Sequence, residues 1–348
     1  MSVDVQRFLG RHGRCARDPK RLDSAHLFAH FSHTMDSLSE LVRLLSPAGT
    51  VDRHCRVAGA WSAHNSQAAP GHVPYHVILT GSAKVLLGKE VLRVSAGDVL
   101  LFPHGAAHTM LGLAGSSRRA AESRHFNGVV TEITVAGAAA PLDILCGTFE
   151  LGASANILLR ALPEVLCVAT AAHDTDTASH DTDWLRGLIG MMHAEADQPR
   201  PGGAAIIADL STALFTILLR TLIARSLVPQ GLLALMADAR MAKAVDAVVR
   251  APEQPWRTDR LAAICSVSRA TLARRFAQLG RMTPLELVTT LRMEHAARLL
   301  RQGELSAATV GERCGYASQA AFGRVFTQHF SMGPGAYRRQ HIEQRSRA

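Results

Sequence analysis

The sequence predicts an α+β protein of two domains: an N-terminal β-barrel with a helical hairpin, and a C-terminal all-α domain with two helix-turn-helix units. Short β-type runs separated by Gly, Pro and Asn fill residues 51–150, which is typical of a sandwich or small barrel. From residue 241 onward the apolar residues have helical spacing. Within that region a 17-residue segment occurs twice, at 268–284 and 318–334, with seven identical positions.

The length of 348 residues is enough for two ordinary domains. We expect a flexible extension at 1–34, the barrel domain at 35–227, a linker at 228–240 and the double helix-turn-helix domain at 241–342. The net charge of +9 is placed unevenly, because residues 241–348 hold 17 basic and 8 acidic side chains. A basic domain beside a neutral one indicates a polyanion partner for one half of the chain; the alternative is a solvated basic face.

Local patterns predict the remaining N-terminal elements. Residues 38–45, LSELVRLL, predict a short amphipathic helix that ends at Ser46 and Pro47. Helices are also expected at about 184–196 and 204–227, after a polar loop at 171–183. The expected strands include YHVILT, SAKVLL, EVLRV, DVLLFP and VVTEITV.

The most apolar segment, 204–219, contains Asp209 and has helical periodicity, so it predicts a buried or interface helix rather than a membrane span. Its apolar residues cover more than one face. We therefore predict that one side packs on the barrel and the other on a second copy of the chain; the alternative is burial within one chain. Six cysteines without a CxxC pair, and no secretory signal pattern, predict reduced thiols in the cytoplasm.

Each copy of the repeat has the pattern of two short helices joined by a tight turn. In the first copy RLAAIC precedes the turn SVS, and Ser268 is a favourable N-cap for the second helix. Leu272 and Phe276 lie four residues apart and form its buried face. Phe322 and Phe326 have the same spacing in the second copy. This arrangement is the helix-turn-helix pattern.

The two units are joined by PLELVTTLRMEHAARLLRQG, residues 284–303, which predicts one long helix. At about 1.5 Å per residue it would extend roughly 25–30 Å. A connector of that length can hold two recognition helices about 34 Å apart, which is one turn of B-DNA. A single chain would then read two successive major grooves.

The pieces LAAICSVSRATLARRF, LRMEHAARLL, GYASQAAFGRVF and MGPGAYRR resemble the AraC/XylS-type DNA-binding domain over about residues 250–340. The resemblance implies double-stranded DNA and RNA polymerase as partners. Arg bonds guanine, Gln pairs with adenine, and Ala contacts the thymine methyl group in the major groove. We interpret Arg275, Arg298 and Arg338 as phosphate contacts or solvated surface. The base-edge contacts that the resemblance implies come from Arg269, Ala270, Arg274, Gln319, Ala320 and Arg324.

In the N-terminal half, Gly97, Pro103, Gly105 and His108 fit the second cupin motif, G-x5-P-x-G-x2-H. The first cupin motif is incomplete: His76 is the best-placed inward histidine, and no carboxylate is in register with it. This argues against a cupin dioxygenase, which needs a complete metal triad. We therefore do not expect an enzyme.

Residues 35–227 resemble the cupin-type sensor domain of one branch of AraC-type regulators, through pieces such as GTVDRHCRVAGAW and CGTFEL. The resemblance is greatest to the branch that includes a regulator responding to reactive chlorine species. Chains of that branch begin near a segment like MDSLSELVRLLSPAGTVD, which makes Met35 a candidate start. The branch has cysteines at the places of Cys55 and Cys146, which implies redox sensing by these thiols.

Four residues are candidates for a metal site. We expect Cys55 just before the first barrel strand, His76 and His108 near the barrel mouth, and Cys146 at the end of a late strand. Two thiolates and two imidazoles suit tetrahedral Zn²⁺. The alternatives are a metal-free pair that forms a disulfide and inert thiols beside a ligand pocket. We interpret Cys167, Cys265 and Cys314 as small buried hydrophobic residues, and Cys15 as incidental.

These observations predict a DNA-binding transcription regulator, an activator, whose cupin domain senses a redox, metal or small-molecule signal. One alternative is a regulator that responds to a small organic ligand and has structural cysteines. A cupin metalloenzyme fused to a DNA-binding domain is the alternative from a different class.

Overall fold

The computed structural model describes residues 36–112, 122–137, 141–152, 156–170 and 179–347. The expected flexible extension at 1–34, with Cys15, lies outside these ranges, as does most of the expected polar loop at 171–183.

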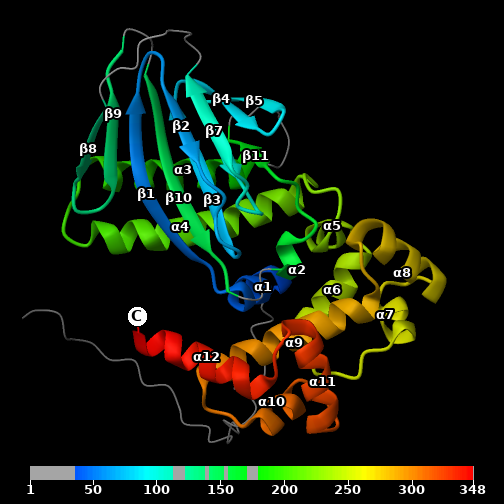
Figure 1. Ribbon diagram of the computed structural model, residues 1–348. Coiled ribbons are helices and arrows are strands. Elements are labelled where there is room, and N and C mark those ends of the chain that lie inside the picture. The colour runs from blue at the N-terminus through cyan, green and yellow to red at the C-terminus, as the bar shows by residue number, and fades with distance from the viewer. Residues whose placement is uncertain (1–35, 113–121, 138–140, 153–155, 171–178, 348) are drawn as a thin grey trace, which may run out of the picture. The chain divides into compact units, whose positions relative to one another are not determined.

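Two β-sheets form the N-terminal domain (Figure 1). The larger has the strand order β11-β6-β3-β10-β1-β9-β8, and the smaller has the order β2-β7-β4-β5. All paired neighbours are antiparallel except β1 and β9, which are parallel. The strands are β1 (Ala48–Val57), β2 (Ser62–Asn65), β3 (His72–Thr80), β4 (Ser82–Leu87), β5 (Glu90–Ser95), β6 (Asp98–Leu101), β7 (His108–Gly112), β8 (Glu122–Phe126), β9 (Thr131–Val135), β10 (Leu142–Glu150) and β11 (Leu166–Ala169).

The seven-stranded sheet is covered on both faces, because successive side chains of a strand point to opposite sides. One face packs against the smaller sheet and encloses a core that includes Ile78, Phe102 and Met110. The other face is covered by the expected hairpin, α3 (Ser179–Asp197) and α4 (Gly203–Ala224), which lies across the strands in Figure 1. Two shorter helices, α1 (Ser37–Leu45) and α2 (Asn156–Leu159), complete the domain.

Helix α4 is long and apolar enough to cross a membrane by length and composition alone, yet half of its most apolar window is buried inside the protein. Tyr75 on β3 shows how closely α4 packs against the sheet. The Tyr75 hydroxyl donates to the Thr50 carbonyl on β1 (2.8 Å) and lies 3.1 Å from the Ser211 hydroxyl on α4. Leu214 and Leu218 are fully buried within the chain, whereas Ile206 is 45% exposed. One side of α4 is therefore buried within the chain, and packing of its other side on a second copy stays a prediction.

Both candidate cysteines lie inside strands. Cys55 is in β1, not before the first strand, and Cys146 is in the middle of β10, not at its end. The charged residues of GTVDRHCRV make β1 difficult to predict from the sequence. In the structure their partners are side chains from elsewhere: Arg53 donates to Asn65, and Arg56 pairs with Asp197.

Gly147, next to Cys146, has no room for a side chain. A Cβ there would lie 2.0 Å from the Thr50 carbonyl oxygen and 2.5 Å from the Tyr75 ring. We expect Gly147→Ala to lower the free energy of unfolding by about 1–3 kcal/mol or more, as overpacking does. The matched control is Gly187→Ala in α3, where a Cβ meets nothing within 4 Å and a gain of about 0.5–1 kcal/mol is expected. Urea unfolding of both variants measures the difference, and equal effects would contradict this packing.

The C-terminal domain consists of helices, with α5 (Leu232–Ala237) in the expected linker, where Leu232, Leu233 and Leu235 are buried. The α+β fold class, with a β-rich N-terminal and a helical C-terminal domain, is confirmed. The other helices are α6 (Met241–Arg250), α7 (Thr258–Ile264), α8 (Arg269–Arg275) with the π-helical segment η2 (Phe276–Gly280), α9 (Pro284–Gln302), α10 (Ala307–Arg313), α11 (Gln319–Phe330) and α12 (Pro334–Arg347).

Helix α9 is the expected connector. Thr283 and Glu286 form a capping box at its start, and Pro284 occupies the first turn, where its missing N–H costs no hydrogen bond. Gly303, with φ of 81°, ends the helix in the left-handed region. Its 19 residues span about 28 Å at 1.5 Å per residue.

Candidate functional site

Two helix-turn-helix units, α7–α8 and α10–α11, are built in the same way. The Ser268 hydroxyl accepts a hydrogen bond from the Thr271 N–H (3.1 Å), and the Ser318 hydroxyl accepts one from the Ala321 N–H (3.2 Å). These caps fix the first residue of each second helix. The repeated serines of the sequence therefore start the two candidate recognition helices at equivalent places.

The turns of the two units differ by one residue. Cys265 and Cys314 are the buried C-caps of the leading helices. Ser266 follows with φ of 54° in the first turn, and Gly315 follows with φ of 79° in the second. A Cβ at Gly315 would lie 2.3 Å from the Glu253 carbonyl oxygen, so glycine is required there. The second turn is longer by one residue, Ala317, because Val267 and Tyr316 make equivalent backbone hydrogen bonds to the leading helices.

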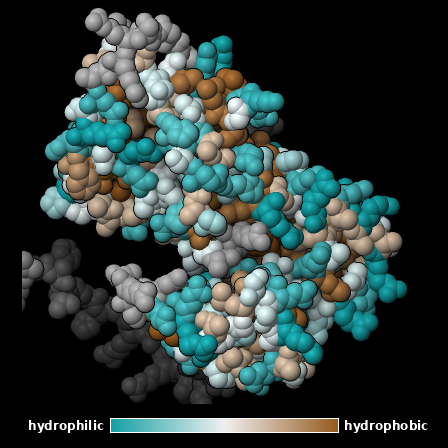
Figure 2. All heavy atoms as spheres, viewed as in Figure 1, coloured by the Kyte–Doolittle hydropathy of each residue, from teal (hydrophilic) through white to brown (hydrophobic). Residues whose placement is uncertain are grey.

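Each second helix has a buried face and an exposed face. Leu272 and Phe276 in the first unit, and Phe322 and Phe326 in the second, are completely buried. In the space-filling view, hydrophilic residues lie among apolar ones over the region of α8 (Figure 2). The six residues predicted to contact bases are all exposed: Arg269, Ala270, Arg274, Gln319, Ala320 and Arg324.

The arginines on these helices differ in their partners. Within the part of the chain that the structure describes, Arg269, Arg274 and Arg324 form no ion pair. Arg275 instead pairs with Asp238, at 3.4 Å. Arg338, interpreted from the sequence as phosphate contact or surface, donates to the Leu305 carbonyl inside the domain. Exposed guanidinium groups without intramolecular partners are available to bond guanine.

In the barrel, three of the four predicted metal and redox residues line one cavity of about 200 Å³ between the two sheets: Cys55, His76 and Cys146. The fourth, His108, contacts His76 directly, with 2.7 Å between their Nε2 atoms. Arg53 also lines the cavity. The structure thus brings together residues that are up to 91 positions apart in the sequence.

The two thiols are diagonal neighbours across β1 and β10. Cys55 is opposite Ile144, and Cys146 is opposite Arg53. A hydrogen bond from Cys146 lowers the pKa of the Cys55 thiol, and the positive charge of Arg53 contributes in the same direction. That same interaction, together with burial, raises the pKa of Cys146 well above its usual value. Cys55 is therefore the group that ionises more readily, and the thiolate is the reactive form of cysteine.

The two histidines are held in defined tautomers. His108 Nδ1 donates to the Ala106 carbonyl (2.8 Å), so its Nε2 accepts from His76 Nε2. This leaves His76 Nδ1 buried without a hydrogen-bond partner among the described residues. Burial, followed by the neighbouring His108, lowers the pKa of His76 well below its usual value. Burial also lowers the pKa of His108, and the pair is neutral at neutral pH.

A third cluster was missed in the sequence. Of the groups of His, Cys, Asp and Glu within the described residues, the one whose ligand atoms all lie within 4.8 Å of one another is His54, Asp143 and His193. His54 neighbours Cys55 but points to the opposite face of β1, because side chains alternate along a strand. Asp143 lies beside His54 because β1 pairs with β10, and the sequence alone does not show this pairing.

The remaining described cysteines lie outside the cavity. Cys265 and Cys314 are buried, as expected, and burial raises the pKa of Cys314 to about 12. Cys167 is exposed, so the interpretation as a buried hydrophobe was wrong. It lies on β11, which is the edge strand of its sheet and buries only alternate residues.

Comparisons with known proteins agree with this architecture. A family model described as cupin matches residues 36–224, and one described as a helix-turn-helix domain matches residues 261–340. The RCS-specific HTH-type transcriptional activator RclR of Escherichia coli (strain K12) is 29% identical, over 87% of this chain and 97% of the relative. The HTH-type transcriptional regulator MtrA of Neisseria gonorrhoeae is 26% identical, over 88% of this chain and 99% of the relative.

Among solved structures, the chain is similar to the DNA-binding domain of AdpA in complex with a target DNA, at 31% identity and a TM-score of 0.30. The match covers 31% of this chain and 96% of that chain. Both family matches, and relatives over almost their whole lengths, lead to one conclusion. The chain belongs to the AraC-type transcription regulators in which a cupin domain precedes a helix-turn-helix domain that binds DNA.

Proposed function

We propose that this regulator is a cytoplasmic transcription activator, without catalytic activity, that is switched by oxidation of Cys55 in its cupin domain. Cys146 is the partner thiol. The observation that carries the proposal is the thiol pair in the cavity, in which the pKa of Cys55 is lowered by its hydrogen bond from Cys146 and by Arg53. The name of the RCS-specific relative supports reactive chlorine species as the class of signal.

The chemistry is a two-electron oxidation by hypochlorous acid. The Cys55 thiolate attacks the chlorine atom, which forms a sulfenyl chloride and releases hydroxide. The Cys146 thiol then attacks the Cys55 sulfur, and chloride and a proton leave as the disulfide forms. The product is more strained than a relaxed disulfide, because diagonal neighbours on a sheet lie about 7–8 Å apart whereas disulfides need Cα atoms within about 7 Å.

This strain gives a route from the thiols to the rest of the molecule. Closing the bond requires β1 and β10 to shift relative to each other. Both strands are central in the seven-stranded sheet, and α4 packs against both. A shift of the strands is therefore transmitted to the helical hairpin. The proposal is tested by comparing transcription from the target promoter, in the presence of oxidant, between the wild type and Cys55→Ser.

Zinc bound by Cys55, His76, His108 and Cys146 is the second form of the same switch. The buried, unpartnered Nδ1 of His76 favours it, but the bond between the two histidines would have to break. Zinc measured on reduced, full-length protein separates the forms: about one ion per chain, lost in Cys146→Ser, supports the metal form. A small organic ligand is less favoured, because the cavity of about 200 Å³ is smaller than the usual 300–1,000 Å³ of ligand pockets.

We further propose that the protein acts as a homodimer and contacts RNA polymerase. Large hydrophobic side chains are exposed on α3, with Trp184 at 64% and Met191 at 53%. Such residues are enriched at protein interfaces.

We expect the wild type to have twice the 37.4 kDa chain mass by light scattering at micromolar concentration. Trp184→Glu combined with Met191→Glu should give the monomer, because two charges would be buried without partners. The matched control is Val91→Glu, which changes another exposed hydrophobic residue and should leave the dimer intact. A monomeric wild type, with and without DNA, would rule out the homodimer.

A further inference from the structure

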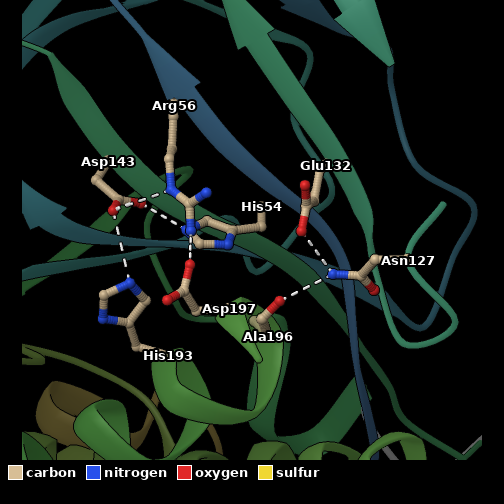
Figure 3. A network of polar contacts seen from close by, with 8 residues as sticks. All are labelled: His54, Arg56, Asn127, Glu132, Asp143, His193, Ala196 and Asp197. Carbon is tan, nitrogen blue, oxygen red and sulfur yellow. Dashed lines mark hydrogen bonds and ion pairs between the residues drawn. The ribbon is translucent and has the colours of Figure 1, made fainter. Parts of the chain in front are cut away.

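Behind the thiol pair, on the opposite face of β1 and β10, two histidines and a carboxylate face one another (Figure 3). His54 Nε2 on β1 lies 2.7 Å from Asp143 Oδ1 on β10. His193 Nε2 on α3 lies 3.6 Å from Asp143 Oδ2. The two imidazole rings are edge to face, with centroids 5.4 Å apart. One ligand atom from each residue lies within 4.8 Å of the others.

We propose that His54, Asp143 and His193 bind a divalent transition metal ion such as Zn²⁺. Two imidazoles and one carboxylate are ligands of Zn²⁺ and of other first-row metals. Three protein ligands leave a further position for water. This site lies outside the barrel, on the face of the sheet that α3 covers, so it is distinct from the cavity that holds the thiols.

The charge around the site permits a divalent cation. Arg56 is the nearest positive group, with its Nε 3.8 Å from Asp143 Oδ2, and it also pairs with Asp197. Figure 3 shows the guanidinium between the two carboxylates. The two carboxylates and the guanidinium sum to a charge of −1 when both histidines are neutral. The closer contact to Asp197 leaves Asp143 available for the ion.

The site is deep on one side and open on the other. The His54 side chain is completely buried, Asp143 is 16% exposed, and His193 is 38% exposed. An ion can therefore enter past His193 and reach a ligand inside the protein. His54 Nδ1 has no hydrogen-bond partner among the described residues. It can carry the ring proton when Nε2 binds the ion, and the hydrogen bond from Nε2 to Asp143 Oδ1 is then given up.

Metal at this site would tie α3 to the two strands that carry Cys55 and Cys146. Its ligands come from β1, β10 and α3, which are three separate elements. Binding to the folded state alone raises the melting temperature by mass action. The ion would therefore stabilise the packing of the helical hairpin on the sheet.

The test is a Co²⁺ titration of the full-length, reduced protein after dialysis against a chelator. We expect one tightly bound Co²⁺ with visible d–d absorption, no thiolate-to-cobalt charge-transfer band, and a raised melting temperature. His193→Ala removes a partly exposed ligand and should weaken binding at least about tenfold. His125→Ala, at an exposed histidine on β8, is the matched control and should bind as the wild type does.

The double variant Cys55→Ser, Cys146→Ser distinguishes this site from the barrel. It should keep the bound Co²⁺ and its d–d spectrum, whatever becomes of the oxidant response. The proposal fails if the wild type binds no Co²⁺ or Zn²⁺ at micromolar concentrations, or if His193→Ala binds as tightly as the wild type. It also fails if the bound ion gives charge-transfer bands that disappear with the cysteines, because that ion would lie in the barrel.

Discussion

Cys55→Ser is expected to abolish the transcriptional response to hypochlorous acid while leaving DNA binding by the reduced protein unchanged. Serine has nearly the shape of cysteine but no thiolate, so the oxidant finds no nucleophile in the cavity. In the wild type, the hydrogen bond from Cys146 and the charge of Arg53 lower the pKa of the Cys55 thiol. In the variant these groups have no thiol to act on. Reporter transcription from the target promoter, with and without oxidant, measures the effect.

The matched control is Cys167→Ser. Cys167 is exposed on β11 and does not line the cavity, so this variant should respond as the wild type does. Cys146→Ser separates the steps, because Cys55 can still be oxidised but has no thiol to bond. Full induction in both Cys55→Ser and Cys146→Ser would place the switch elsewhere.

Arg274→Ala combined with Arg324→Ala is expected to remove most of the sequence-specific DNA affinity. Each arginine bonded to guanine contributes about 1–3 kcal/mol of discrimination. The two substitutions are in separate helix-turn-helix units, and distant sites usually add. The combined loss is then about 2–6 kcal/mol in specific binding. Fluorescence anisotropy with a duplex selected from a random pool, and with a scrambled duplex at the same salt concentration, measures it.

Arg275→Ala is the control on the same helix. Its guanidinium pairs with Asp238, so we expect a small and similar change on both duplexes. An equal loss on the selected and the scrambled duplex for Arg274→Ala and Arg324→Ala would mean that these arginines contact only phosphates. Steep weakening with salt is expected for every variant, because phosphate contacts release counterions.

The helical half of the fold was predictable because its signals are local. Ser268 and Ser318 mark helix starts through their own side chains, and Phe322 and Phe326 mark a buried face by their spacing alone. The capping box of Thr283 and Glu286 likewise lies within four consecutive residues. None of these features depends on knowing what lies elsewhere in the fold.

The sheet was less predictable because its contacts are long-range. The polar residues of β1 hid that strand, since Arg56 finds its partner Asp197 more than a hundred residues away. His54 drew no attention for the same reason: its partner Asp143 becomes visible only when β1 is paired with β10. The exposure of Cys167 follows from the edge position of β11, which no local pattern encodes.

The sequence could suggest that Cys55, His76, His108 and Cys146 converge, but it could not establish it. The convergence of these residues depends on the register of β10, which places Cys146 opposite His76 on β3 and opposite Arg53 on β1. A slip of one residue would turn Cys146 to the α4 face. The direct bond between the two histidines was not foreseen at all.

The most direct measurement is differential alkylation with mass spectrometry on the reduced full-length protein, exposed to increasing doses of hypochlorous acid while transcription is followed in parallel. We expect Cys55 and Cys146 to lose their reactive thiols first and together, as one cross-linked pair, at the dose at which transcription rises. Cys265 and Cys314, which are buried, should remain reduced at that dose. Full transcription while Cys55 and Cys146 are both still reduced would contradict a thiol switch in the cupin barrel.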